Sequence, residues 1–296
     1  MAAEFISRFL AQYVRYFYVW ITQSPPGNRW LTRHFRKWFP DEEIVVNTLR
    51  GFAMAASPRG YTTHRIYFFG EYEHDMSDFI TYHVFEGQTA WDIGSERGWF
   101  SLLLGRMVGP SGRVDAFEAF PPHAEKARRN IQLNKMSWVN VNAVAVSDKS
   151  GHLWFQPPGP WYPRESNHSG VGHLTDQYLP GAIKVPTISL DNYAEETGVK
   201  HLSFIKLDIE GAEVAALKGA ERVVRRCRPV LAIEYSDAAA QRTQSSIEEL
   251  DNLLESYEYD RYLYQGRYVR FDLGQLRQDG LEADFNVYCF PRKVES

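Results

Sequence analysis

From Ile66 onward the sequence alternates short apolar runs with longer amphipathic stretches. Apolar runs of about four to eight residues are typical of buried strands, and apolar residues three or four apart indicate helices. The predicted strands are TAWDIG, RVDAFEAF, VNVNAVAV, SFIKLDIE and PVLAIEY, at 89–94, 113–120, 139–146, 203–210 and 229–235. The predicted helices cover 99–107, 123–133, 212–226 and 245–257. This alternation predicts an α/β fold in which helices cover both faces of a parallel sheet.

Two aromatic-rich segments follow the last predicted helix. Residues 259–272, YDRYLYQGRYVRFD, have a Gln-Gly turn between two arms, and residues 285–292 read FNVYCFPR. Strand-like arms joined by a glycine turn are typical of a hairpin. We therefore expect the sheet to finish with antiparallel pairing.

The first 40 residues differ from the rest of the chain. In residues 5–21 the aromatic residues recur every three or four positions with Arg8 and Arg15 opposite, which predicts an amphipathic helix. Residues 1–40 hold five Arg and one Lys against a single Glu. The helix can pack on its own domain, form a homodimer contact or lie on a membrane surface. We assign 1–65 to a basic helical extension or cap and 66–296 to the main α/β domain.

Composition narrows the class of protein. The chain of 296 residues is 44% hydrophobic and carries a net charge of −4, so neither disorder nor charge-driven nucleic-acid binding is indicated. Cys227 and Cys289 form no metal-binding motif. No secretory signal or run of about 20 apolar residues is present. The pattern favours a cytoplasmic location, with membrane association through the basic helix as the alternative.

A glycine turn follows the first predicted strand. The segment WDIGSERGWF, 91–100, runs from Asp92 through Gly94 and Gly98 into an apolar helix. Glycines let the backbone turn sharply and approach a ligand, whereas plain strand-to-helix turns use them too. Glu118 ends the next strand, 20 residues after Gly98, where nucleotide-binding folds place a carboxylate on ribose hydroxyls. A solvated strand-end carboxylate is the alternative for Glu118.

The sequence of the turn also helps to decide between two classes of cofactor. Dinucleotide enzymes use GxGxxG to admit a pyrophosphate, but here Ser95 and Glu96 stand between the glycines. A negative Glu96 side chain would repel a diphosphate and suits a phosphate-free cofactor with a cationic sulfonium. The charge pattern favours S-adenosylmethionine over NAD.

Over roughly residues 66 to 235 the sequence resembles the FkbM family of S-adenosylmethionine-dependent methyltransferases. The most specific match is FIKLDIEGAE at 204–213, followed by LKGA at 217–220. Further matches are GEYE at 70–73, AVSD at 145–148 and TISLD at 187–191. The resemblance implies a Rossmann-like class I methyltransferase fold, a seven-stranded sheet with one antiparallel C-terminal strand, and O-methylation of sugars or secondary metabolites.

Two departures from the family pattern concern the cofactor turn. The family's first motif usually reads Asp-x-Gly-Ala-Asn-x-Gly, whereas Ser95 and Glu96 stand here in place of the small and amide residues. The ribose carboxylate is usually followed by Pro, but Ala119 and Phe120 come between Glu118 and Pro121. The turn and the carboxylate are both kept.

The candidate cofactor residues lie at the predicted turns and strand ends. They are Glu73, Asp92, Gly94, Ser95, Glu96, Gly98, Glu118, Ser147, Asp148 and Asp208. For Asp148, an ordinary turn-forming role in SDKSG is the alternative.

Asp208 and Glu210 are the first candidates for acceptor orientation or proton removal. They follow the fourth strand, at the edge where open α/β sheets bind ligands. On a strand they would share one face, which could hold a divalent ion, although no metal site is assigned. The alternative for Glu210 is a cap on a helix starting near Ala212.

Residues 157–184 are rich in Gly and Pro and predict a lid over the acceptor. The lid segment contains Trp161, Asn167, His168 and His173. His168 is the alternative catalytic base, while exposed bystander histidines are common in loops. A hydroxyl acceptor calls for a base, and a carboxylate acceptor needs none. The expected acceptor is a small molecule or glycan. The competing functions are a nucleotide-dependent oxidoreductase and a non-catalytic cofactor-binding module.

Overall fold

The computed structural model describes residues 42–60, 62–157, 172–264 and 267–292. The chain divides into two compact units, the first ending at Ser77 and the second beginning at Asp78. The predicted domain division at residue 66 stays a prediction. The amphipathic helix expected at 5–21 lies outside the described residues.

In the first unit, two antiparallel strands precede a short helix. The strands are β1 (Ile44–Asn47) and β2 (Ala53–Ala56), and the helix is α3 (Thr63–Phe69). Gly70 ends α3 in the left-handed conformation, and Glu71 forms an ion pair of 2.8 Å with Arg50. The GEYE motif therefore stabilises this unit. Helix α4 (His74–His83) begins in the first unit and ends in the second.

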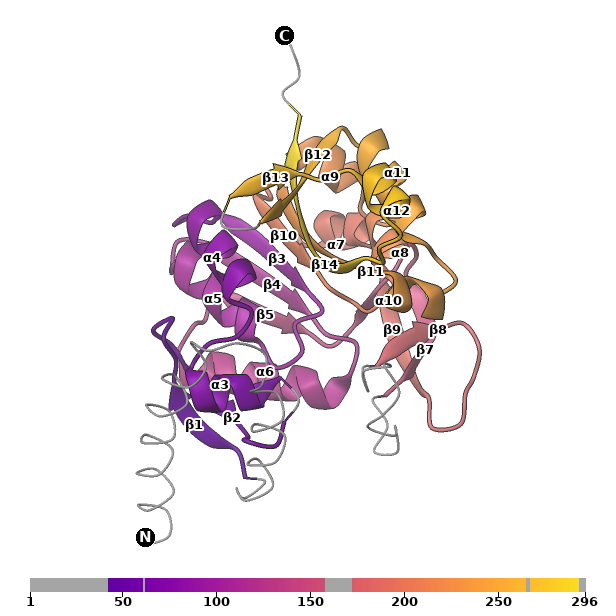
Figure 1. Ribbon diagram of the computed structural model, residues 1–296. Helices are drawn as coiled ribbons and strands as arrows, with labels where there is room; N and C mark the ends of the chain where they lie inside the picture. The colour runs from indigo at the N-terminus through magenta and orange to yellow at the C-terminus, as the bar shows by residue number, and fades with distance from the viewer. Residues whose placement is uncertain (1–41, 61, 158–171, 265–266, 293–296) are drawn as a thin grey trace, which may run out of the picture. The chain divides into compact units, whose positions relative to one another are not determined.

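An eight-stranded sheet forms the centre of the second unit, in the order β13-β12-β14-β11-β10-β3-β4-β5 (Figure 1). Its strands are β3 (Thr89–Ile93), β4 (Arg113–Phe117), β5 (Val139–Asn142), β10 (Phe204–Leu207), β11 (Val230–Ser236), β12 (Tyr259–Tyr264), β13 (Tyr268–Arg270) and β14 (Asp284–Pro291). The five strands from β11 to β5 are parallel, and β14 is antiparallel to both β11 and β12. The predicted Rossmann-like α/β sheet with an antiparallel C-terminal strand is confirmed. The sheet has eight strands instead of the predicted seven, because β13 pairs antiparallel with β12 at the edge.

Helices cover both faces of the sheet. They are α5 (Trp99–Val108), α6 (Pro121–Leu133), α7 (Leu190–Glu196), α8 (Glu213–Lys218), α9 (Glu221–Cys227), α10 (Asp237–Arg242), α11 (Ile247–Ser256) and α12 (Leu273–Gln278). Trp91, Ile205 and Leu231 pack into one apolar core with residues of α7, α8, α9 and α11. Because strand side chains alternate, Asp92 and Lys206 face the other side, where α5 lies.

A second, smaller sheet was not predicted. It has the order β6-β9-β7-β8, with β6 (Ala145–Val146), β7 (Gly151–Gln156), β8 (His173–Thr175) and β9 (Ile183–Ile188). The strand expected at 139–146 is in fact two strands, because β5 ends at Asn142 and β6 joins the smaller sheet. The helix expected at 212–226 is likewise two helices, α8 and α9, which meet at Gly219 and Ala220. Among the described residues no helix has the length and apolar character needed to cross a bilayer.

Candidate functional site

The turn after β3 packs against the turn after β10. Gly94 and Gly98 have φ angles of 85° and 89°, and Glu96 between them has 46°. A Cβ atom on Gly94 would collide with the backbone carbonyl oxygen of Asp208. Backbone N–H groups of Gly94 and Ser95 both donate to Phe117 O at 3.0 Å, which ties the turn to the end of β4. The left-handed Glu96 costs on the order of 1–3 kcal/mol, so the surrounding contacts hold a strained turn.

Glu118 lies next to this turn and is only 8% exposed. Its carboxylate accepts N–H donors from Glu96 and Phe120, each at 2.8 Å. Burial raises the pKa of Glu118 to about 7, although these two N–H donors oppose the shift. The alternative of a solvated strand-end carboxylate is wrong. A carboxylate that accepts two backbone N–H groups still has free lone pairs. These lone pairs can accept hydrogen bonds from ribose hydroxyl groups.

Asp92 is completely buried beneath the same turn. Its Oδ2 accepts a hydrogen bond of 2.5 Å from Ser101 Oγ on α5, and its Oδ1 lies 3.6 Å from Lys206 Nζ. Burial raises the pKa of Asp92, and the Lys206 ammonium group and the Ser101 hydroxyl oppose this. In the described structure Asp92 supports the turn from below.

Lys206 is a residue that sequence reasoning missed. Its ammonium group donates to Gly94 O at 2.8 Å and lies 3.3 Å from Asp208 Oδ2. The signal was present, because a lysine in the otherwise apolar run FIKL has to be paired when it is buried. The ammonium group brings the glycine turn and the Asp208 carboxylate into one cluster.

The turn fits a cofactor such as S-adenosylmethionine. Ser95 Oγ is buried and has no hydrogen-bond partner among the described residues. Such a hydroxyl is costly to leave without a partner and is suited to a polar ligand. The Glu118 carboxylate bonds to the backbone N–H of the next residue, Glu96, and negative charge near the turn disfavours a diphosphate.

The pKa of Glu118 gives a prediction for binding. Ribose hydroxyls donate to the ionised carboxylate, so the affinity for S-adenosylhomocysteine should rise between pH 6 and pH 8, as Glu118 ionises near pH 7. Glu118→Gln should remove this pH dependence and weaken binding at pH 8 by about 1–3 kcal/mol. Calorimetry at both pH values measures the effect, with Glu125→Gln on the exposed side of α6 as the control. An affinity in Glu118→Gln equal to wild type would remove Glu118 from the site.

The same pKa shift predicts how the stability of the free protein depends on pH. Because the folded pKa of Glu118 lies above its ordinary value, its contribution to stability is present below that ordinary value and is lost as pH rises through about 7.

Three carboxylates meet at the ends of β10 and β11. Oxygens of Asp208, Glu210 and Glu234 lie within 4.8 Å of one another, and Arg242 Nη2 contacts Glu210 Oε2 at 2.7 Å. Burial and the Asp208 charge raise the pKa of Glu210, while Arg242 opposes this. Three carboxylates can accept hydrogen bonds from the hydroxyl groups of a methyl acceptor, or they can bind a divalent ion. Glu234, on β11, was not among the predicted residues.

Two expectations about this cluster need correction. Strand β10 ends at Leu207, so Asp208 and Glu210 do not share a strand face, and Glu210 has a left-handed φ of 58°. The proximity of the two carboxylates comes from the turn instead. Glu210 also does not cap α8, whose cap residue Ala212 has no side-chain bond. Glu213 Oε1 accepts the Ile209 N–H at 2.9 Å at this helix start.

The smaller sheet packs on the loops that carry the site. Phe155 of β7 and Leu174 of β8 share an apolar cluster with Phe120 and Ile209, which follow Glu118 and Asp208. Phe120 stacks on Phe155 with ring centroids 5.7 Å apart, and this contact gives the inserted Ala119-Phe120 a structural role. The sheet thus fixes both site loops from the side of the predicted lid.

Of the two histidine candidates, one lies in the part of the chain that the structure describes. His173 is in β8, and its pKa is lowered by burial and by the positive charge of Arg242. His168 lies outside the described residues, as do Trp161 and Asn167. Their roles, and the lid at 157–184, stay predictions.

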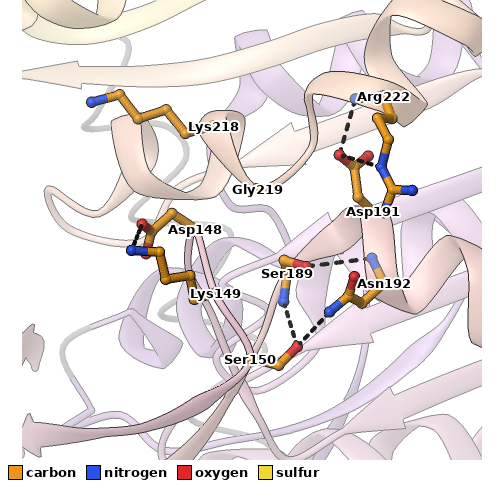
Figure 2. A pocket seen from close by; sticks show the side chains of 9 residues that line it. All are labelled: Asp148, Lys149, Ser150, Ser189, Asp191, Asn192, Lys218, Gly219 and Arg222. Carbon is orange, nitrogen blue, oxygen red and sulfur yellow. Dashed lines mark hydrogen bonds and ion pairs between the residues drawn. The ribbon is translucent and has the colours of Figure 1, made fainter.

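Three other predicted cofactor residues, Glu73, Ser147 and Asp148, have contacts of a different kind. Glu73 belongs to the first unit, where its carbonyl accepts the Ser77 N–H. Ser147 lies against Gly219, where a Cβ atom would collide with Ser147 O. Asp148 lines a polar surface pocket of about 320 Å³ (Figure 2). The assignment of these residues to a cofactor stays a prediction.

The charged side chains of this pocket are bonded to one another or to neighbours (Figure 2). Asp191, from the TISLD motif, accepts the backbone N–H groups of Arg222 and Val223 at 3.0 and 2.8 Å. Lys218 contacts Glu249 at 2.7 Å, and Lys149 lies 3.6 Å from Asp148. The pocket shares no residue with the glycine turn or the acidic cluster, and its bonds join α7 to α9.

Asp191→Ala should therefore lower stability without affecting the site. It removes the carboxylate that caps α9, which should cost about 1–2 kcal/mol in the free energy of unfolding. Chemical denaturation measures the loss, and S-adenosylhomocysteine affinity should stay unchanged. Glu195→Ala removes an exposed partner of Arg222 and serves as the control. Weaker cofactor binding in Asp191→Ala alone would connect the pocket to the site.

Residues 92–261, more than half of the chain, match the family model described as the Methyltransferase FkbM domain. The chain belongs to the FkbM methyltransferase family. The matched region contains the glycine turn, Glu118 and the acidic cluster. The predicted family resemblance is confirmed.

This FkbM-family chain is similar to several methyltransferases over part of their length. It is 28% identical over 158 residues to the 2-O-methyltransferase NoeI of Sinorhizobium fredii, covering 50% of this chain and 64% of NoeI. It is 26% identical over 121 residues to a protein-L-isoaspartate O-methyltransferase of Caenorhabditis elegans, covering 38% and 52%. A crystal structure of Methyltransferase FkbM from Methylobacillus flagellatus KT aligns with 19% identity and a TM-score of 0.43, over 70% of this chain and 44% of that one. The chain thus spans less than two thirds of each of these proteins.

Proposed function

We propose that this chain transfers a methyl group from S-adenosylmethionine to a hydroxyl oxygen of a sugar, glycan or natural-product acceptor. The observation that carries the proposal is the bridge made by Lys206, whose ammonium group contacts Gly94 O of the cofactor turn and the carboxylate of Asp208. A bound sulfonium cofactor supplies an activated methyl group, so the protein chiefly has to orient the acceptor and exclude water.

In this proposal Glu118 binds the ribose hydroxyls, and the Gly94–Gly98 turn receives the rest of the cofactor. Asp208 takes the proton from the acceptor hydroxyl as the methyl group is transferred. Glu210 and Glu234 accept hydrogen bonds from neighbouring acceptor hydroxyls, with their oxygens within 4.8 Å of those of Asp208. The alternative bases are His168 and His173 of the predicted lid segment, of which His173 is affected by the charge of Arg242, the ion-pair partner of Glu210.

The charges of the cluster favour a hydroxyl acceptor over a carboxylate. Three acidic side chains converge, against the two cations Lys206 and Arg242. A carboxylate acceptor would bring a further acidic group into a cluster in which the Asp208 charge already raises the pKa of Glu210, and it would be repelled. A hydroxyl donates to carboxylates and is favoured by them. NoeI is named a 2-O-methyltransferase, which agrees with this choice.

Methyl transfer can be tested with methyl-labelled S-adenosylmethionine and pairs of neutral glycosides and their matching uronates. We expect label in a neutral glycoside as an alkali-stable methyl ether. Label found only in uronates, and released as methanol by alkali, would identify a carboxylate acceptor and contradict the proposal. Cofactor binding without label in any acceptor would favour the non-catalytic binding module.

The remaining assignments are proposals of the same kind. A cytoplasmic location and a contact of the basic extension with membrane or a second copy rest on sequence. Vesicle co-sedimentation of the chain with and without residues 1–40 tests the membrane contact.

A further inference from the structure

We propose that Lys206 is a positioning residue for methyl transfer, which fixes the carboxylate of Asp208 relative to the cofactor turn. The inference rests on the proposed function, because it assigns Asp208 the role of base. It starts from the burial of Lys206, which is 2% exposed in a strand whose four residues are all buried. A buried ammonium group costs several kcal/mol unless it is paired, so its partners define its role.

The ammonium group has partners from both strands that border the site. It donates to Gly94 O at 2.8 Å and lies 3.3 Å from Asp208 Oδ2 and 3.6 Å from Asp92 Oδ1. Lys206 and Asp92 are directly paired in register on β10 and β3. The Lys206 ammonium group therefore joins Gly94 O by a hydrogen bond and the two carboxylates by charge.

The two carboxylates depend on Lys206 to different extents. Asp92 also accepts a hydrogen bond of 2.5 Å from Ser101 and is enclosed by protein. The side chain of Asp208 is 26% exposed, and Lys206 is its one ion-pair partner among the described residues. Removal of Lys206 therefore leaves Asp92 with a second contact but leaves the orientation of Asp208 unsupported.

A purely structural role for Lys206 is the alternative. In that case its charge only neutralises Asp92 in the protein interior, and Asp208 keeps its position without it. The two roles separate when the charge of Asp92 is removed at the same time, because an Asn at position 92 no longer needs a cation.

The test compares Asp92→Asn alone with the double variants K206M/D92N and K206Q/D92N. Methionine fills the space of lysine without a donor, whereas glutamine keeps an N–H donor. Relative to D92N, we expect kcat to fall about 100-fold in K206M/D92N and about tenfold in K206Q/D92N, the loss that follows from a misplaced reacting group. The substrate is the glycoside that the wild type methylates. S-adenosylhomocysteine affinity should fall by less than kcat, because the turn is also held by the N–H groups of Gly94 and Ser95, which donate to Phe117 O.

A kcat in K206M/D92N equal to that of D92N would overturn the proposal, and so would an equal loss in both double variants. Thermal unfolding shows which variants fold. If K206M/D92N does not fold, an unchanged kcat in K206Q/D92N is the overturning result.

A second readout needs no acceptor. Crystal structures of D92N and K206M/D92N should show the Asp208 carboxylate in one rotamer in the first and in a different rotamer, or in several, in the second. The same single rotamer in both would overturn the proposal. If wild type fails to bind S-adenosylhomocysteine, the proposed function fails, whereas these structures still test the role of Lys206.

Discussion

Asp208→Asn should lower kcat by about 10²–10⁴-fold, the usual contribution of a general base, and leave S-adenosylhomocysteine affinity within about threefold of wild type. The amide keeps the shape of the side chain but cannot accept a proton from the acceptor. The side chain lies 3.3 Å from Lys206 Nζ and near Glu210 and Glu234, at the ends of β10 and β11. Turnover with the glycoside methylated by wild type measures the effect.

The matched control for this variant is Asp279→Asn, at an exposed position after α12. It should leave both kcat and cofactor affinity unchanged. Full kcat in Asp208→Asn would contradict the assignment and move proton removal to His173. A loss of affinity as large as the loss of kcat would instead make Asp208 a cofactor ligand.

Gly94→Ala should abolish cofactor binding and lower the free energy of unfolding by at least about 3 kcal/mol. Two costs add at this position. The φ of 85° is unfavourable for any residue with a Cβ atom, by about 1–2 kcal/mol. The new Cβ would also meet Asp208 O, which belongs to backbone and cannot rotate away.

Gly198→Ala separates these two costs. Gly198 has a similar φ of 66°, but nothing lies within 4 Å of an added Cβ. It should lose only the conformational part, about 1–2 kcal/mol, and keep its affinity for S-adenosylhomocysteine. Chemical denaturation and calorimetry on both variants decide the matter. Equal losses in the two variants would mean that the contact between the turns after β3 and β10 is not tight.

The parallel strands of the central sheet could be predicted because each is a short apolar run with a turn at its end. The smaller sheet could not, because its strands have weak patterns. Strand β8 has three residues, and β7 begins with the exposed Gly151 and His152. Their pairing depends on contacts distant in sequence, such as Trp154 with Lys184 and Thr175.

The break between α8 and α9 shows a second limit. The apolar spacing of 212–226 continues through Gly219, so periodicity alone predicts one helix. Gly219 lies so close to Ser147 that no side chain fits, and Asp191 caps the second helix. Both causes are tertiary contacts, and a periodic pattern does not contain them.

In the site, sequence could place single residues at strand ends but could not show which of them touch. The positions of Gly94, Glu118 and Asp208 followed from motif spacing. The involvement of Glu234 did not follow from motif spacing. Glu234 lies on β11, and its distance from Asp208 depends on how β11 pairs in register with β10. The ion pair of Glu210 with Arg242 likewise joins two segments about 30 residues apart.

Calorimetric titration of the folded full chain with S-adenosylhomocysteine at pH 8 tests the central claim most directly. The claim is that the Gly94–Gly98 turn and Glu118 bind an adenosyl cofactor. It predicts saturable binding at one site per chain, weakened in Glu118→Gln and absent in Gly94→Ala. The absence of heat in wild type, with both S-adenosylhomocysteine and S-adenosylmethionine, would contradict it.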